Sequence, residues 1–342
     1  MDILPQDLVD AARERLKGYC RVCKFCDGLA CRGEVPGMGG AGYGMGFVNN
    51  ITALAGIKLN LRTIHQAVDP DPSLSLFGRE YVSPLIVAPM AGMNYNLGGR
   101  IKEEELANSL IRGAKSAGFM AMTGDGRDPE EFLTGYKIIA ELKWGLPVLK
   151  PWPLSKLIAR IRDCEKLEIP AVGIDLDGIG LEQSDVPGEQ SFTPKSLKEL
   201  QEITHSTRLP VFFKGIMTVK EAELAVKAGA AGIVVSNHGG RVLDGTPGVA
   251  SVLAEITLKA AGRLIVLADG GVRSGVDILK YLALGAQAVL VGRPLLIAAA
   301  GGGATGVKTA LLNLNEQFRT AMMMTGCRSL KEINSQVLWR AK

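Results

Sequence analysis

The sequence lacks a strong excess of either charge. Its 342 residues carry 39 Lys and Arg against 35 Asp and Glu, and the basic residues are dispersed rather than clustered. Proteins that bind nucleic acid usually show a basic patch or stripe. The charge pattern therefore predicts no nucleic-acid partner.

The sequence also lacks a long apolar run and a secretory leader. A membrane span needs about 18 apolar residues, and Arg293 interrupts the best candidate, 288–300. The first ten residues contain acidic residues, no basic one and no apolar core, unlike a signal peptide. We therefore expect a cytoplasmic protein with no membrane partner.

The remaining composition is that of a globular protein, with 47% apolar and 22% charged residues. From residue 81 short apolar runs alternate with helix-compatible stretches, a rhythm typical of a parallel sheet covered on both faces. Eight such runs predict a (β/α)8 TIM barrel over 81–342, behind an N-terminal extension over 1–80. The runs are 84–88, 119–122, 147–149, 171–174, 210–213, 232–235, 264–268 and 288–291.

Two smaller expectations concern helices. Residues 5–17 show one apolar face and predict a helix in the extension. Residues 298–306, which read AAAGGGATG, predict a small flexible stretch that opens a helix over about 307–325.

The stretch 233–241, IVVSNHGGR, is the strongest candidate for chemistry. A short buried strand ends there and is followed by His238 and Arg241, and the carboxyl end of a barrel strand is where this fold carries its active site. Histidine supplies a base that titrates near neutrality, and the planar arginine fork fits a carboxylate or phosphate. The alternative is a loop in which His238 only hydrogen-bonds backbone.

Glycine and arginine recur after the last two predicted strands, as Asp269-Gly270-Gly271-Val272-Arg273 and as Gly292-Arg293. Glycines let backbone N–H groups approach an anion, and this fold often binds phosphate after strands seven and eight. These segments predict a phosphate site. Lys214, at the end of another strand, is expected to point at a ligand rather than to snorkel to solvent.

Together these motifs resemble the FMN-dependent α-hydroxy-acid oxidising enzymes, the glycolate oxidase and lactate oxidase family. The resemblance runs through FKGIMT (213–218), AGAAGIVVSNHGGRVLDGTP (228–247), LADGGVRSGVDILKYLALGAQAVLVGRP (267–294) and GCRSLKEI (326–333), and more weakly through PLIVAPMAGM (84–93). It implies an enzyme that uses FMN to oxidise a small 2-hydroxy acid to the 2-oxo acid, with an unspecified electron acceptor and a homo-oligomeric assembly.

The resemblance also implies residue roles. His238 would be the base, Asp175 would stabilise its imidazolium, Arg241 would hold the substrate carboxylate, and Lys214 would face the flavin and stabilise its reduced form. The residues that would contact FMN are Pro89, Met90, Ala91, Thr123, Lys150, Lys214, Ser236, Asp269, Gly270, Gly271, Arg273, Gly292 and Arg293.

The sequence departs from this family in its substrate shell. Where the family usually has Gln-x-Tyr, this chain has Lys150-Pro151-Trp152, and Gly173 replaces a threonine. The loop 176–182 contains no arginine, although the family carries one there that contacts substrate. Lys150 could supply the missing positive charge. Two other interpretations stay open: a non-redox FMN barrel similar to type 2 isopentenyl diphosphate isomerase, and a non-catalytic flavin-binding redox sensor.

Four cysteines lie outside the family pattern. Cys20, Cys23, Cys26 and Cys31 form a C-x2-C-x2-C-x4-C run, and such crowding in a cytosolic chain indicates metal or redox chemistry. The spacing is similar to a ferredoxin-type run, although the last gap is longer and no proline follows. We expect a [4Fe–4S] cluster ahead of zinc, with unliganded thiols as the remaining alternative.

Overall fold

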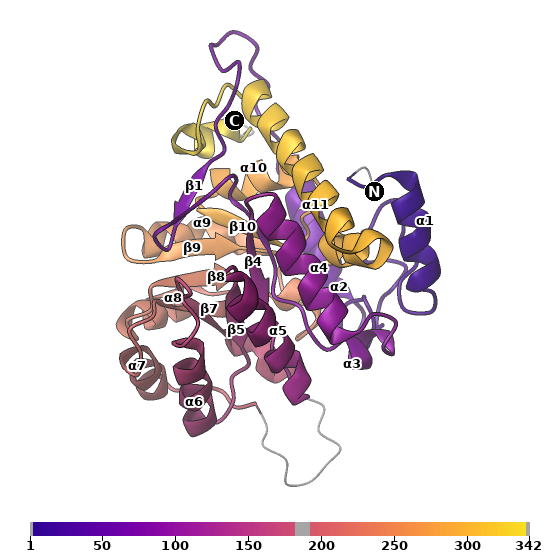
Figure 1. Cartoon of the computed structure of the whole chain (residues 1–342). Coiled ribbons are helices and arrows are strands. Elements are labelled where there is room, and N and C mark those ends of the chain that lie inside the picture. Colours follow the sequence, from indigo (N-terminus) through magenta and orange to yellow (C-terminus); the bar gives the residue numbers. More distant parts are fainter. Residues whose placement is uncertain (1–2, 182–191, 340–342) are drawn as a thin grey trace.

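The computed structural model describes residues 3–181 and 192–339 and has a closed barrel of eight parallel strands at its centre (Figure 1). The hydrogen-bonded order around the barrel is β10-β3-β4-β5-β6-β7-β8-β9, so each strand lies beside its neighbour in the chain and the last closes on the first. The strands are β3 (Leu85–Val87), β4 (Met120–Thr123), β5 (Leu146–Leu149), β6 (Val172–Asp175), β7 (Val211–Ile216), β8 (Gly232–Val235), β9 (Ile265–Ala268) and β10 (Ala288–Val291). All eight predicted runs become barrel strands.

The strands form because their residues are apolar on both faces. Nearly every position in them is buried, with interior side chains on one side and covering helices on the other. The helices that follow the strands are α3 (Met93–Leu97), α4 (Glu103–Ser116), α5 (Pro129–Leu142), α6 (Leu154–Cys164), α7 (Leu197–His205), α8 (Val219–Lys227), α9 (Val249–Ala260), α10 (Gly275–Ala283) and α11 (Arg293–Met324). The predicted TIM barrel is therefore confirmed.

Short 3₁₀ helices shape two loops at the carboxyl end of the barrel and part of the C-terminal segment. They are η1 (Leu176–Leu181), directly after β6, η2 (His238–Gly240), after β8, and η3 (Leu330–Glu332) and η4 (Ser335–Val337) near the end of the described chain. The first two place the side chains that follow β6 and β8 at the mouth.

The last helix is longer than the sequence predicts. The stretch 298–306, expected to be flexible, lies inside α11, which is interrupted only by the non-helical backbone of Gly303. The flexible interpretation was wrong because packing decides here: a Cβ at Gly301 would lie 2.1 Å from the Leu8 carbonyl oxygen of α1, which leaves no room for a larger residue. By length and composition α11 could also span a membrane, but 56% of its most apolar window is buried inside the protein.

The extension lies against the barrel. Helix α1 (Gln6–Arg15) packs along α11 (Figure 1), as its predicted apolar face requires. The cysteine and glycine-rich segments follow, then α2 (Met45–Gly56), which packs against η2 and α9. A small antiparallel hairpin, β1 (Leu74–Leu76) and β2 (Arg79–Tyr81), precedes the first barrel strand.

Candidate active site

A cavity of about 460 Å³ opens at the carboxyl ends of the barrel strands, within the range of cofactor and ligand sites. The residues predicted from the sequence converge there from seven strands and their loops. Those that line it are Pro89, Met90, Ala91, Lys150, Asp175, Lys214, His238, Arg241, Asp269, Gly270, Gly271, Arg273, Gly292 and Arg293.

Two predicted flavin contacts do not line this cavity. Thr123 is buried at the end of β4, and its side chain lies against Gly135 of α5. Ser236 is fully buried, and its hydroxyl donates a hydrogen bond to Asp269 Oδ2 at 2.9 Å. Flavin contact by either residue stays a prediction.

The loop that carries His238 has a constrained backbone. His238 has a φ of 57°, in the left-handed region that a residue with a Cβ seldom adopts. Its N–H donates to Ser236 Oγ at 3.0 Å. Gly240 approaches Phe47 of α2 so closely that a Cβ would lie 2.1 Å from the Phe47 nitrogen, and Asn50 of α2 donates to Asn237 at 2.8 Å. The extension thus helps to fix the loop.

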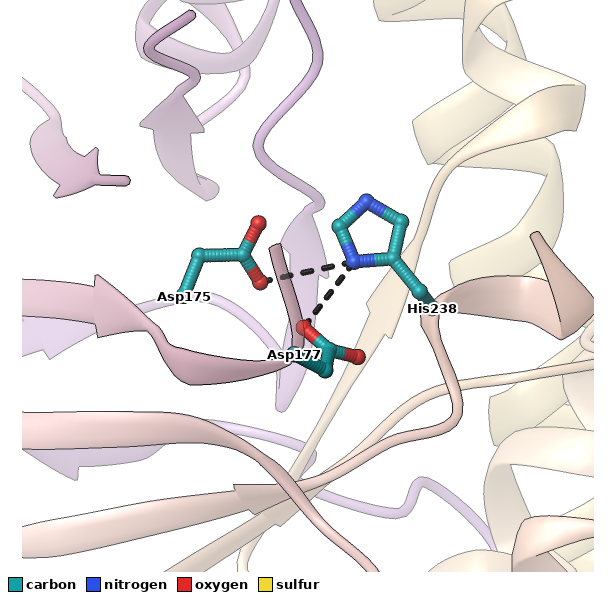
Figure 2. Close-up of side chains that lie close together, drawn as sticks. All are labelled: Asp175, Asp177 and His238. Carbon is teal, nitrogen blue, oxygen red and sulfur yellow. Dashed lines mark hydrogen bonds and ion pairs between the residues drawn. The ribbon is translucent and has the colours of Figure 1, made fainter. Parts of the chain in front are cut away.

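Two carboxylates face one ring nitrogen of His238 (Figure 2). Nδ1 lies 3.0 Å from Asp177 Oδ1 and 3.5 Å from Asp175 Oδ1, while the other ring nitrogen points away from both. Acceptors at Nδ1 favour the tautomer with its proton there, which leaves Nε2 as the basic atom. Asp177 was missed from the sequence, although its place two residues after Asp175, in the same strand-end loop, was a usable signal.

Two lysines complete this cluster. Asp175 accepts a hydrogen bond from Lys150 Nζ at 2.5 Å and from Lys214 Nζ at 2.9 Å. Lys214 Nζ also lies 3.3 Å from His238 Nδ1. Asp175, Asp177 and His238 form a group of possible metal ligands, but the two ammonium groups already balance its carboxylates. Within the described chain Asp177 Oδ2 is buried without a hydrogen-bond partner.

Burial and these charges set the protonation states. Burial lowers the pKa of His238, the lysines push it the same way, and the two carboxylates only partly oppose them. Burial alone would raise the pKa of Asp175, but His238, Lys150 and Lys214 hold it well below its usual range. Since the net shift of His238 is downward, we assign a neutral imidazole beside an ionised Asp175 at neutral pH.

The part of the cavity formed by the segments after β9 and β10 fits the ribityl and phosphate portions of FMN. Asp269 Oδ1 is buried with no partner in the described chain, and burial raises the pKa of this carboxyl to about 6. A hydroxyl of the ribityl chain would satisfy it. Gly270 and Gly271 have positive φ angles and lie against Asn50, so no side chain could stand there. The chain's own residues therefore fit the cofactor.

Three arginines, Arg241, Arg273 and Arg293, also line the cavity, and none pairs with a carboxylate in the described residues. Arg293 donates to the carbonyls of Met38, Gly39 and Gly239. Arg241 donates to Gly37, Gly39 and Asn96, and Arg273 donates to Val272 and Cys26. Burial lowers the pKa of Arg293 to about 9, and the other two arginines push it the same way. The region carries uncompensated positive charge.

Two departures from the family pattern have physical reasons. Trp152 is buried and its Nε1 donates to Asp125 at 2.8 Å, so its polar atom is used within the wall. A Cβ at Gly173 would lie 2.5 Å from the ring of Phe212, so the threonine expected there has no space. Of the arginine-free loop 176–182, residue 182 lies outside the described residues.

The segments 269–273 and Gly292-Arg293 form a cradle that fits the FMN phosphate, and with the barrel they define a flavin-binding fold. Comparison with known proteins identifies the family. Residues 37–177 and 101–340 match the family described as FMN-dependent dehydrogenase. The 4-hydroxymandelate oxidase of Amycolatopsis orientalis is 35% identical over 95% of this chain and 94% of its own length. The L-lactate oxidase of Lactobacillus jensenii is 30% identical over 83% and 76%.

Comparison with solved structures gives the same family. A mandelate oxidase bound to 3,3-difluoro-2-hydroxy-3-phenylpropionic acid superposes with a TM-score of 0.78 at 32% identity, covering 98% of each chain. The chain therefore belongs to the FMN-dependent dehydrogenase family and is an FMN-dependent oxidoreductase of 2-hydroxy acids, as the sequence predicts. The family description names FMN and neither iron–sulfur nor zinc, so it supports FMN alone.

Proposed function

We propose that the chain oxidises a 2-hydroxy acid with an aromatic side chain, with His238 as the base. The observation that carries the roles is the Nδ1 contact with Asp177 and Asp175, which leaves Nε2 of a buried, neutral imidazole facing away from the carboxylates. Nε2 accepts one of the two protons that the substrate loses. Asp177 and Asp175 then stabilise the imidazolium.

The other cluster residues position and balance charge. Bound FMN supplies the oxidant, which takes up the two electrons that the hydroxy acid loses. Lys214, whose pKa is raised by Asp175, Asp177 and Asp269 against the effect of burial, remains protonated and would face that group from near the carboxyl end of β7. Lys150 holds Asp175 from the other side. Both lysines therefore keep the Asp175 carboxylate ionised and fixed.

Arg241 is the proposed holder of the substrate carboxylate. Three hydrogen bonds from its guanidinium go to Gly37, Gly39 and Asn96, and arginine has five N–H donors. Two donors therefore remain for a carboxylate in the cavity that Arg241 lines. The resulting fork is charge-assisted and fixes the substrate's orientation.

The aromatic preference rests on the rest of the wall. Met93, Tyr95, Leu181 and Phe192 also line the cavity, and they offer apolar surface for a substrate ring. Relatives named for mandelate and 4-hydroxymandelate support the same class. Because His238 with its carboxylate partners Asp177 and Asp175 is suited to proton abstraction, a non-redox isomerase or a non-catalytic sensor is less well supported.

The test is anaerobic reduction of bound flavin by a panel of 2-hydroxy acids. We expect mandelate or 4-hydroxymandelate to bleach the visible flavin bands faster than lactate or glycolate. His238→Gln should retain FMN and lose reduction by about 10²–10⁴-fold. Bleaching at the wild-type rate in His238→Gln would remove this residue from the mechanism, and no bleaching of the wild type by any acid would overturn the function.

The cellular context is also a proposal. We infer a cytoplasmic enzyme, because all six cysteines are free and four of them crowd one segment. A homo-oligomer is proposed from the family resemblance, and light scattering of the FMN-loaded protein measures it. Reoxidation by dioxygen compared with an artificial one-electron acceptor determines the electron acceptor.

A further inference from the structure

The four clustered cysteines converge in space as well as in sequence. Cys20, Cys23, Cys26 and Cys31 together line a small cavity between the extension and the start of α11. None forms a disulfide. Four thiols around one space are a ligand set for a thiophilic metal.

This cavity adjoins the proposed phosphate cradle. Met38 and Arg293 line both the cysteine cavity and the large cavity at the barrel mouth. Arg273 donates to the Cys26 carbonyl at 3.0 Å and to Cys26 Sγ at 3.5 Å. Arg293 therefore lies between the proposed phosphate site and the cysteine cavity, and Arg273 contacts one of the four cysteines.

The backbone around Cys20 has a geometry that favours a thiolate at its sulfur. The Val22 N–H donates to Cys20 Sγ at 3.4 Å, within the first C-x2-C step, and Val22 has a φ of 45°, rare for a β-branched residue. Hydrogen bonds to cysteine sulfur from backbone and arginine stabilise thiolates and tune a cluster's potential. Such a strained backbone persists only where its surroundings require it.

The spacing of the sulfurs favours a cluster over a single ion. Among the described residues, no three cysteine sulfurs lie within 4.8 Å of one another. Zinc binds thiolates at about 2.3 Å and would gather its four sulfurs closely. The free space is narrow, about 20 Å³, so the segment that carries the cysteines would have to move outward around a cluster.

We propose that Cys20, Cys23, Cys26 and Cys31 bind an iron–sulfur cluster directly behind the FMN-phosphate cradle, with Arg273 as its second-sphere hydrogen-bond donor. The cluster's net negative charge, with its four thiolates, would balance the arginines from the outside. The assignment of the cradle rests on the proposed function, but the cysteine site itself does not.

The first experiment measures iron and acid-labile sulfide in the full-length, FMN-loaded protein after anaerobic reconstitution with ferrous iron and sulfide. We expect about four of each per chain, with loss of both in Cys23→Ser/Cys26→Ser. Cys164→Ser and Cys327→Ser, which remove the two isolated buried cysteines, are the matched controls and should keep full loading. FMN content checks that each variant is folded.

A wild type that takes up no iron, or that binds one zinc in preference to iron, overturns the proposal. So does equal iron in the double variant and the controls. Because iron and sulfide are measured without substrate, this result is independent of whether any 2-hydroxy acid reduces the flavin.

A second measurement tests the role of Arg273. Arg273→Gln should leave the iron content intact and shift the cluster's reduction potential to more negative values, because a positive donor to Cys26 Sγ is removed. Arg32→Gln is the control, since Arg32 belongs to the same segment but is exposed and does not line the cysteine cavity. Equal potentials in both variants would exclude Arg273 from the second sphere.

Discussion

The two sides of the barrel mouth handle charge in opposite ways. On the His238 side, two carboxylates meet two lysines and an imidazole within 3.8 Å, so the charges compensate one another inside the protein. On the arginine side, Arg241, Arg273 and Arg293 donate mainly to backbone carbonyls, and the described residues offer them no carboxylate. The His238 side can therefore accept a proton where its own charges are balanced, and the arginine side can bind anions.

This comparison predicts the largest stability loss on the compensated side. Asp175→Asn leaves two buried ammonium groups without their carboxylate, and breaking a buried pair costs about 3–5 kcal/mol. Urea unfolding of the apoprotein measures it. Asp177→Asn, whose partner is mainly His238, is the control and should cost clearly less. Equal losses would mean that the lysines do not depend on Asp175.

On the arginine side the largest effect should appear in cofactor affinity rather than stability. Arg293→Met relieves repulsion between neighbouring cations, which offsets part of the loss of its hydrogen bonds to Met38, Gly39 and Gly239, so the apoprotein should lose less stability than Asp175→Asn. Loss of a charge-assisted bond to the phosphate, worth about 1.5–3 kcal/mol, should weaken FMN binding by roughly 10–100-fold. Fluorescence titration with FMN measures this change. Unchanged affinity would place the phosphate elsewhere.

The pH dependence of flavin reduction should report the His238 side. Since the pKa of His238 lies below its ordinary value, the base is present at neutral and alkaline pH, and the rate should fall only below about 6.5. Lys150→Gln removes a cation that lowers this pKa, so the fall should begin at higher pH. Stopped-flow reduction between pH 5 and 9 tests this. A fall that starts at the same pH in both proteins would contradict the assignment.

A smaller pH effect belongs to Asp269. Its carboxyl, with a pKa of about 6 in the free protein, is a better acceptor when ionised, so FMN affinity should increase as the pH rises through about 6. Asp269→Asn should bind FMN more weakly and with a smaller pH dependence, because ionisation of the FMN phosphate, whose second pKa is also about 6, contributes in both proteins. Titrations at pH 5 and 7.5 suffice, and a parallel pH dependence in both proteins would argue against the contact.

The barrel could be predicted because the sequence signals for its strands are local. Each strand is a short run buried on both faces, as for Gly232–Val235, and the glycine and arginine motifs follow their strands directly. Asp177 was missed because its role depends on which loop side chain reaches His238 Nδ1, and only the tertiary structure determines that. The flexible interpretation of 298–306 failed for a related reason: Gly301 is small because α1 passes there, not because the chain must bend.

The same limit applied to the arginines. Sequence position correctly placed Arg241 and Arg293 at the mouth, but nothing local shows that both guanidiniums hold the carbonyls of the glycine-rich loop around Gly37 to Gly39. That loop comes from the extension, more than 190 residues away in the chain. Contacts of this range depend on the closed fold.

The contact between Gly240 and Phe47 has a consequence for how the chain can be divided. The base-bearing loop keeps its left-handed turn because a helix from the first 80 residues presses against it and Asn50 bonds to it. A polypeptide of residues 81–342 would retain every strand of the barrel. It would lose the contacts of Phe47 and Asn50 that hold the loop of His238. The boundary expected near residue 80 therefore does not mark two parts that work independently, because residues before it hold the loop that carries His238.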